Sequence, residues 1–454
     1  MSAGRTLAFF AVVAGLLAGL FALTGSPPEP PEGKVIIDVW HPWPGDQGEE
    51  FHRLVGVFNE RNDHIHVRLL YVPNNLSSNQ KLFLSISAGM PPDCTFVDGP
   101  QVAEWAARGA LESLDGLMAK RGVSNDDFWP PCVRQNQFRD QTYALTYCAD
   151  PNFAFFWNKE TFRDAGLPPD RPPRTLEELD AMARKLTSCD GDTLTRIGFI
   201  PWNVFGYANS IFTWGWAFGG RFYDYDNDRI VCGEDPHILE AVEWMCSYAD
   251  EYGFEAINSF AEGFGDQADN PFVRGKIAMA AGHVSNIKLF KKYAPNLDYG
   301  ACAFPYPEHM GSDHSAWMGG WCMGIPRGSR HPEAAFEFMQ WLCTDEEAGR
   351  SMITTTGTFP GYINSPGFES VAGNPKLEVF YDVLRNTQHQ RPVMPAQAYF
   401  MGALDRAVSD ILHGLLPPED ALMQAQTETQ RELDRVLAKA ASVEAAASAE
   451  AGAQ

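Results

Sequence analysis

The chain has 454 residues, of which 45% are hydrophobic and 12% aromatic, and its formal net charge is −23. It is too long for one core, and its apolar residues suffice to fill two domains. The negative charge, with lysines and arginines scattered rather than clustered, argues against a nucleic-acid-binding function.

The N-terminus is typical of an exported protein. Residues 1–25 carry one arginine, followed by an apolar run from Leu7 to Leu23, which is the layout of a signal peptide or an uncleaved anchor. Ser26 stands where a bacterial lipoprotein has its lipid-bearing cysteine, so we expect no lipid there. Residues 26–34, SPPEPPEGK, predict a stiff spacer. We expect a periplasmic or cell-surface protein, tethered to the membrane if the segment stays uncleaved.

Strands and helices alternate after the spacer. They are predicted in turn at residues 35–40, 49–62, 66–73, 79–89, 93–99 and 101–114. This alternation predicts a parallel sheet, in which ligands bind beyond the carboxyl ends of the strands. Those ends lead into residues 40–46, with the candidate ligand residues Trp43 and Asp46, and into 98–100, with Asp98. The alternative for Asp98 is a cap on the following helix.

The second half of the chain also combines predicted strands and helices, but its sequence does not repeat that of the first half. Strands are predicted at 152–159 and 275–282, and helices at 174–186, 236–252, 332–342 and 418–438. Thr175 and Glu178 form a capping-box pattern at the start of one helix. Residues 439–454 are of low complexity and have nothing to bury, so we expect a frayed or disordered tail.

An uncharged, tryptophan-rich stretch, FIPWNVFGYANSIFTWGWAFGG, occupies residues 199–220. Flat apolar rings beside neutral hydrogen-bonding groups suit a sugar, which has C–H faces and hydroxyl edges. Trp202, Asn203 and Trp214 are therefore candidate ligand contacts. The alternative is a large buried aromatic cluster.

No metal or cofactor site is predicted. The nine cysteines lack zinc-binding spacing. Some can pair in an oxidising compartment, and the odd number leaves at least one free. Several are expected to be buried as small apolar side chains.

Residues 224–235 carry acids at calcium-loop positions, but Arg229 replaces the glycine of the turn. A polar hairpin is the better prediction there.

Ten segments occur in the order found in one protein family. They are VWHPWPGDQ, FNERNDHIHV, SAGMPPDCTFVDGPQVAEWAARGALESLD, ALTYCADPNFAFFWNKETFRDAGL, RTLEELDAMARKLT, GFIPWN, TWGWAFGG, FVRGKIAM, GGWCMGIPRGSRHPEAAFEFMQWL and TGTFPGYI. With them the chain, from about Val35 to about Ala438, resembles the extracellular solute-binding proteins of bacterial carbohydrate ABC transporters. Maltose- and glycerol-phosphate-binding proteins belong to this group.

The resemblance implies an α/β, two-lobed periplasmic-binding-protein fold. Each lobe would hold a mostly parallel sheet flanked by helices, and a three-segment hinge would join the lobes. The hinge segments would lie near 148–153, 302–307 and 356–361. Lobe one would comprise 35–149 and 308–355, and lobe two 150–307 and 356–438. The ligand would lie in the cleft between the lobes.

Two departures from the family pattern change the candidate ligand residues. His283 follows Gly282 where the family often has Gly-x-Trp, so it offers a hydrogen bond in place of a stacking ring. Pro151 stands where the family often has an aspartate, with Asp150 and Asn152 on either side. We therefore add His283, Asp150 and Asn152 to the candidates.

Three more candidates follow from the later segments. Trp321 lies in SAWMGGWCMGIP, where Gly320 permits close approach of the backbone to a ligand; interlobe packing is the alternative for the tryptophan. Arg391 can bind sugar hydroxyls or a phosphate through its planar fork, or form a structural ion pair.

Three functions compete. The first is a non-catalytic, monomeric sugar receptor that delivers its ligand to a membrane permease, with several tryptophans favouring a di- or oligosaccharide and glycerol phosphate as the alternative ligand. The second is an exported glycan-acting enzyme, which would need two carboxylates about 5 to 10 Å apart, such as Asp98 and Asp150. The third is a ligand sensor with the same fold.

Overall fold

The computed structural model describes residues 32–73, 76–191, 193–265, 267–312, 315–387 and 389–451. The predicted signal segment and most of the spacer lie outside these residues. Across the described residues, no helix combines the length and the apolar character that a membrane crossing requires.

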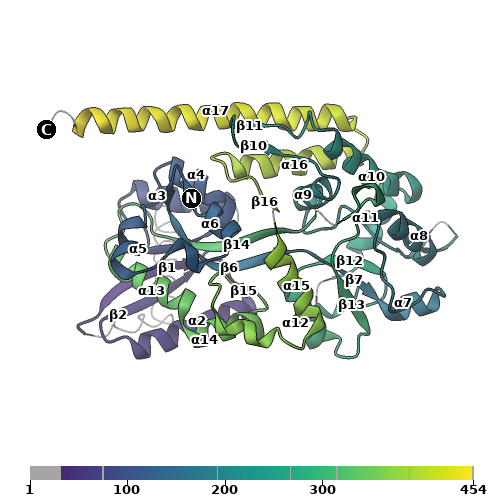
Figure 1. Cartoon of the computed structure of the whole chain (residues 1–454), viewed down its shortest axis with the longest axis horizontal. Coiled ribbons are helices and arrows are strands. Elements are labelled where there is room, and N and C mark those ends of the chain that lie inside the picture. The colour runs from purple at the N-terminus through teal and green to yellow at the C-terminus, as the bar shows by residue number, and fades with distance from the viewer. Residues whose placement is uncertain are drawn as a thin grey trace, which may run out of the picture.

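The molecule consists of two lobes, as the sequence predicted for an α/β two-lobed fold. Figure 1 shows them side by side, with strands β6 (Ala144–Asn152) and β14 (Trp317–Gly324) running through the middle. We call the part built on the large sheet lobe one and the part built on the three-stranded sheet lobe two.

The large sheet has the strand order β15-β6-β14-β3-β1-β2, with β16 beside β14. Its other strands are β1 (Val35–His41), β2 (Ile65–Tyr71), β3 (Cys94–Asp98), β15 (Phe359–Pro360) and β16 (His389–Gln390). β1 pairs in parallel with β2 and β3, whereas β14 is antiparallel to β3 and β6. The pairing is mixed rather than mostly parallel because β14 enters the sheet from lobe two.

The sheet of lobe two has the order β12-β7-β13. These strands are β7 (Ala154–Asn158), β12 (Met279–Gly282) and β13 (Tyr299–Cys302). Both pairs are antiparallel, which differs from the mostly parallel sheet that we expected in each lobe. Only Phe153 separates β6 from β7, so the chain passes from the large sheet to the small one at this residue.

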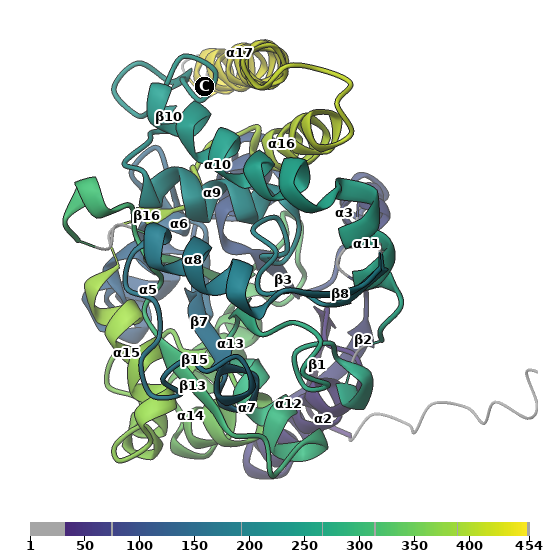
Figure 2. The same ribbon diagram turned by 90° about the vertical axis from the view of Figure 1, so that its right-hand side faces the viewer.

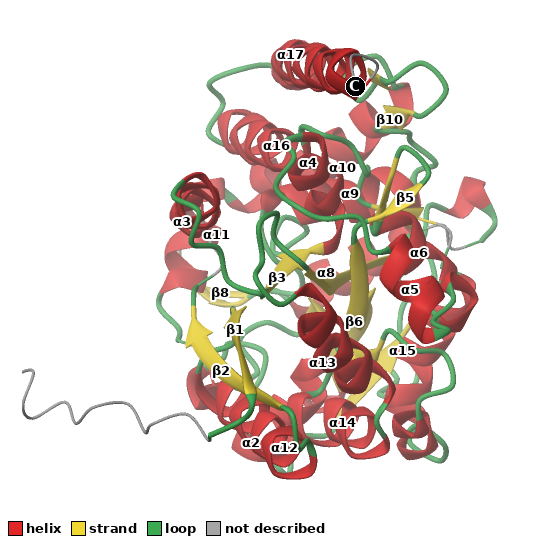
Figure 3. Cartoon of the chain, turned by 90° about the vertical axis from the view of Figure 1, so that its left-hand side faces the viewer, coloured by secondary structure: helices red, strands yellow, loops and turns green. Residues whose placement is uncertain are grey.

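Helices cover both faces of the large sheet. In lobe one they are α2 (Gly45–Arg61), α3 (Leu76–Ser87), α4 (Val102–Ala107), α5 (Asp115–Arg121), α6 (Pro130–Gln135), α13 (Pro332–Thr344) and α14 (Glu346–Ser351). Figure 3 shows α13, α5 and α6 around β6, and α13 and α6 both contact this strand. α4 is shorter than the helix predicted over 101–114, because the chain turns at Gly109, whose φ is +67°.

Lobe two is mainly helical. Its helices are α7 (Lys159–Asp164), α8 (Leu176–Leu186), α9 (Tyr207–Ala217), α10 (Pro236–Tyr252), α11 (Phe254–Glu262), α12 (Ser285–Tyr293), α15 (Pro375–Asn386) and α16 (Gln397–Leu412). The side chain of Thr175 accepts a hydrogen bond from the Glu178 backbone N–H, as a capping residue does. α9, α10 and α16 pack together (Figure 2) around a buried aromatic core.

Short hairpins complete the described part of the fold. Their strands are β4 (Gln137–Phe138), β5 (Gln141–Thr142), β8 (Ser188–Asp190), β9 (Thr193–Arg196), β10 (Tyr223–Asp224) and β11 (Arg229–Ile230). The β10–β11 pair is antiparallel and confirms the hairpin predicted within residues 224–235.

The final helix, α17 (Pro418–Ala451), lies against α16 and α10 of lobe two and reaches α4 of lobe one (Figure 1). The sequence predicted a helix only to residue 438 and a frayed tail beyond it. The helix continues instead, because this stretch is rich in alanine and glutamate, which favour the α-helix.

None of the nine cysteines forms a disulfide. Six are buried, namely Cys94, Cys132, Cys148, Cys232, Cys322 and Cys343. Burial raises the pKa of each of these thiols, so they remain protonated, unreactive packing groups. This confirms the expectation that several cysteines serve as small apolar side chains.

Candidate ligand-binding site

An ion pair between two predicted residues lies at the end of β3. Arg391 Nη2 donates to Asp98 Oδ1 at 2.6 Å, and the two side chains are 12% and 14% exposed. Arg391 directly follows β16, and its guanidinium lies over the Trp317 ring at 5.8 Å. The structure therefore shows the ion pair that the sequence left open for Arg391. Its buried Nε has no hydrogen-bond partner among the described residues, so one donor remains available.

A second polar pair connects the lobes. Asp150 lies on β6 opposite Gly319 of β14, and His283 directly follows β12 of lobe two. His283 Nε2 is 3.4 Å from Asp150 Oδ1, and both side chains are largely buried. Because 3.4 Å is long for a hydrogen bond and Asp150 Oδ1 has no hydrogen-bond partner among the described residues, this oxygen is available to accept a hydrogen bond from a ligand hydroxyl.

Two glycines of β14 bring these pairs close together. A Cβ on Gly320 would lie 2.3 Å from the Cys148 carbonyl oxygen, so only glycine fits there. A Cβ on Gly319 would lie 3.0 Å from Asn152 Nδ2 and 3.7 Å from Arg391 Nη2. Gly320 thus serves the close pairing of β14 with β6, and Gly319 leaves room for the polar side chains of Asn152 and Arg391.

Two partly exposed tryptophans lie on the lobe-one side of these polar groups. Trp43 follows β1, and Trp321 pairs in register with Asp98. Their rings are edge to face with centroids 6.3 Å apart. Trp321 also lines a small cavity of about 30 Å³ together with Trp40 and Trp105. The structure therefore places Trp43 and Trp321 beside Asp98.

Phe205 is an aromatic residue of this region that the sequence analysis did not nominate. It precedes Gly206 and α9, has a φ of +54°, and is 55% exposed as a residue. The ring stacks on Phe153 at 5.1 Å and lies 6.1 Å from His283. A positive φ is unusual for a bulky residue and often accompanies a functional site. In the sequence, Phe205 could have been nominated only from the Phe-Gly pair that immediately precedes a helix.

Trp202 and Trp214, by contrast, lie in the core of lobe two. Trp202 is 3% exposed and donates its indole N–H to Asn258 Oδ1 at 3.3 Å. Trp214 is fully buried and donates to the Pro201 carbonyl at 2.8 Å. Asn203 is exposed beside them. The burial of both rings favours the buried aromatic cluster that the sequence left as the alternative.

Asp46 forms a contact between the lobes away from these residues. It lies in the first turn of α2, and Lys292 Nζ on α12 donates to Asp46 Oδ2 at 2.7 Å. This hydrogen bond lowers the pKa of the Asp46 carboxyl. The Asp46 side chain remains 57% exposed, so the structure places it in a solvated interlobe ion pair.

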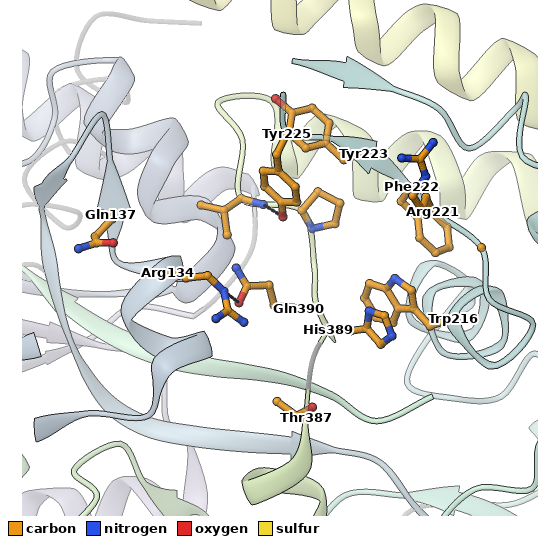
Figure 4. Close-up of a pocket in the computed structure, with 13 residues that line it drawn as sticks. Arg134, Gln137, Trp216, Arg221, Phe222, Tyr223, Tyr225, Thr387, His389 and Gln390 are labelled. Atoms are coloured by element: carbon orange, nitrogen blue, oxygen red, sulfur yellow. Dashed lines mark hydrogen bonds between the residues drawn. The ribbon is translucent and has the colours of Figure 1, made fainter. Parts of the chain in front are cut away.

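A larger cavity lies on the other side of the segment that carries Arg391. It has a volume of about 840 Å³, and Figure 4 shows the stacked Trp216 and His389 rings and the Arg134–Gln390 contact within it. Gln390 points into this cavity while Arg391 contacts Asp98, since successive residues of an extended segment point in opposite directions. None of the predicted ligand residues lines it.

We define the junction row as the side chains at the lobe junction that these contacts connect. It runs from lobe one to lobe two through Trp43, Trp321, Asp98, Arg391, Asn152, Asp150, His283 and Phe205. The described residues include no group of three or more histidines, cysteines or acids that could hold a metal ion. The row combines aromatic rings with hydrogen-bonding groups from both lobes.

Comparison with known proteins places this arrangement in context. The family model described as bacterial extracellular solute-binding protein matches residues 42–349. The mannitol-binding protein of Pseudomonas aeruginosa is 26% identical over 407 residues, covering 84% of this chain and 90% of that protein. The sn-glycerol-3-phosphate-binding periplasmic protein of Pectobacterium atrosepticum is 23% identical, covering 69% of this chain and 70% of that protein.

A solved structure matches as well. CpMnBP1, with mannobiose or mannotriose bound, superposes with a TM-score of 0.78 at 26% sequence identity, covering 87% of this chain and all of that one. The similarity therefore extends over both lobes.

Proposed function

Since the chain belongs to the family of bacterial extracellular solute-binding proteins, we propose that it captures a di- or oligosaccharide at the lobe junction and delivers it to the permease of an ABC transporter. The observation that carries this proposal is the junction row, in which aromatic rings flank polar pairs contributed by both lobes. A sugar fits such a row, because its C–H faces stack on rings and its hydroxyls bond the polar groups.

The spacing of the rings supports more than one sugar unit. Trp43 and Trp321 offer partly exposed rings in lobe one, and Phe205 offers one in lobe two, with the polar pairs between them. Two separate aromatic positions suit a ligand with two or more rings. Mannobiose and mannotriose, the ligands bound by CpMnBP1, belong to this size class.

Glycerol phosphate is the second candidate ligand because several relatives are named for binding sn-glycerol 3-phosphate. The charges of the row disfavour it. Arg391 is already paired with Asp98, and Asp150 adds a second carboxylate nearby. A phosphate would therefore meet a row whose acids outnumber its arginine, whereas a neutral sugar can accept hydrogen bonds from Arg391 and donate them to the carboxylates.

The proposed role is binding without catalysis. The named relatives are binding proteins, and a receptor gains nothing from stabilising a transition state. Asp98 is paired with Arg391 of another segment, and Asp150 lies beside His283 of the other lobe. This arrangement holds a ligand between two lobes. The bound sugar should be recovered intact after incubation.

Export and delivery follow from the same proposal. Family membership implies an exported protein, and the N-terminal segment would serve as its signal peptide or anchor. Closure of the lobes around the sugar would present a surface that the permease recognises, as hinge closure does in binding proteins of this architecture.

Isothermal titration calorimetry tests the proposal directly. We expect saturable binding of mannobiose or mannotriose and weaker binding of mannitol and glycerol 3-phosphate. Phe205→Ala should weaken sugar binding at least tenfold, because it removes the exposed stacking ring of lobe two. Tyr399→Ala is the matched control, since Tyr399 is 40% exposed but lies outside the junction row. Binding of glycerol 3-phosphate alone, or equal effects of both variants, would contradict the proposal.

A further inference from the structure

A cavity of about 380 Å³ lies where α17 passes over lobe one. We call it the basic pocket. Its buried walls are apolar and small, with Ala106 on α4 and Val436 and Ala440 on α17. α4 and α17 are in contact here (Figure 1). The pocket is therefore built jointly by lobe one and by a helix that begins in lobe two.

The rim of the pocket is strongly basic. Five cationic side chains from four segments of the chain line it, namely Arg108, Arg139, Arg327, Arg435 and Lys439. The whole chain has 35 lysines and arginines against 58 acids. Five cations around one cavity are a local exception to the acidic character of this protein, which points to a function for them.

Only part of this charge is balanced by neighbouring acids. Glu104 contacts Arg108 at 2.8 Å, and Glu432 contacts Arg435 at 2.6 Å. No ion pair within the described part of the chain involves Arg327 or Lys439. Two cations at the rim thus have no acidic partner there.

Gly109 helps to place one of these cations. Its φ of +67° turns the chain at the end of α4, and the missing side chain leaves space for Arg327, whose Nη1 lies 3.4 Å from where a Cβ would be. The turn that ends α4 thus leaves room for the Arg327 guanidinium at the rim. An arginine fork suits an oxyanion, which it can bind through two parallel hydrogen bonds.

We propose that the basic pocket binds a multivalent oxyanion of the phosphate-ester or diphosphate class. The volume corresponds to about a dozen water molecules at roughly 30 Å³ each, which is enough for a diphosphate or a small phosphorylated headgroup. The apolar walls would contact the organic part of the ligand, and the rim would bind the phosphate. The site is separate from the junction row and does not depend on which sugar binds there.

Calorimetric titration of the purified chain with inorganic pyrophosphate at low ionic strength tests the pocket. We expect saturable binding with one site per chain and a raised melting temperature, because a ligand of the folded state stabilises it. The double variant Arg327→Gln/Lys439→Gln should weaken binding at least tenfold. All substituted side chains are exposed, so the variant should still fold.

A matched control separates a site from a general charge effect. Lys120→Gln/Arg274→Gln removes two exposed cations that do not line the pocket and should leave pyrophosphate binding unchanged. Absence of saturable binding in the original chain, or equal weakening in both double variants, would overturn the proposal.

A vesicle experiment distinguishes the two sources of such an anion. Co-sedimentation with vesicles containing phosphatidylglycerol, but not with pure phosphatidylcholine, and its loss in Arg327→Gln/Lys439→Gln would identify a lipid headgroup as the ligand. Pyrophosphate binding without vesicle binding would identify a soluble phosphate ester. Vesicle binding that persists in the variant, together with no binding of pyrophosphate, would overturn the proposal.

Discussion

The tryptophans of the two lobes lie in different environments although the sequence nominated both sets for the same task. Trp43 and Trp321 are partly exposed at the end of the large sheet, beside the Asp98–Arg391 pair. Trp202 and Trp214 are buried, and their indole N–H groups bond to partners inside lobe two. The difference teaches that an uncharged aromatic stretch does not by itself indicate a ligand site. Whether such a stretch contacts a ligand depends on its position relative to the ends of the strands.

The largest effect that separates the two environments should come from Trp214→Ala. The ring is fully buried against Phe199, Trp244 and Phe304. Removing it should lower the free energy of unfolding by about 3–5 kcal/mol, the range for a buried large-to-small change. Urea unfolding measures this loss, and calorimetry on the folded fraction should show near-unchanged sugar affinity. An unchanged stability with lost affinity would instead make Trp214 a ligand contact.

Trp321→Ala should have the opposite profile. If the ring stacks on the sugar, the variant should lose about 2–4 kcal/mol of binding free energy, as truncation of an aromatic hot spot does. The loss of stability should be smaller, because Trp321 is already partly exposed in the free protein. Calorimetry and urea unfolding of the same variant give both numbers. A large loss of stability at wild-type affinity would assign Trp321 to interlobe packing.

The sequence predicted the fold in detail because most elements carry a local signal. The helix predicted at 236–252 is α10, and the strand predicted at 35–40 is β1, each with matching periodicity or β-branched content. Strand direction has no such signal, which is why the antiparallel pairing of β7 with β12 and β13 was not foreseen. It depends on contacts between segments far apart in the chain.

The candidate site was only partly predictable for the same reason. Asp98 follows a strand, and its position could be inferred from the parallel-sheet rule. Its partner Arg391 is 293 positions away, so no local pattern could show that the two form an ion pair. Phe205 lies in the same aromatic stretch as the buried tryptophans, but it is exposed because it occupies the turn before α9. The positive φ of that turn could not be inferred from the residue types alone.

The third largest effect should be a pH dependence of the free energy of unfolding, caused by His41 in the ring cluster around Trp43. His41 is buried against Trp43 and Phe51, and burial together with His52 lowers its pKa to about 4 from an ordinary 6.5. The unfolded chain therefore takes up this proton first as the pH falls. The free energy of unfolding is therefore not reduced by His41 above pH 6.5. Between pH 6.5 and pH 4 it falls as the pH is lowered, by at most about 1.4 kcal/mol per pH unit.

His41→Phe should flatten this part of the pH profile, measured by urea unfolding between pH 4 and pH 7. At neutral pH it also removes an imidazole whose two buried nitrogens have no hydrogen-bond partner in the described residues. His237→Phe is the control, because His237 is exposed. A slope that is the same in His41→Phe and the original chain would show that His41 is not the group responsible.

The smallest effect should come from Asp46→Asn, which tests whether this candidate of lobe one contacts the ligand or only Lys292. The carboxylate is exposed and paired across the lobes, and an exposed ion pair contributes little and is screened by salt. Because Lys292 lowers the pKa of Asp46, the pair stabilises the fold above the ordinary pKa of an aspartate. That contribution is lost as the pH falls through the lowered value.

Asp46→Asn and Lys292→Gln should therefore change sugar affinity by the same small factor at low ionic strength, and both changes should vanish in about 0.5 M salt, where the Debye length is only a few ångströms. The agreement of the two variants is the decisive measurement, since each removes the same ion pair from a different lobe. A loss of affinity that appears only in Asp46→Asn and persists in high salt would mean that the carboxylate bonds the sugar itself. Asp46 would then join Trp43 and Trp321 on the lobe-one side of the junction row.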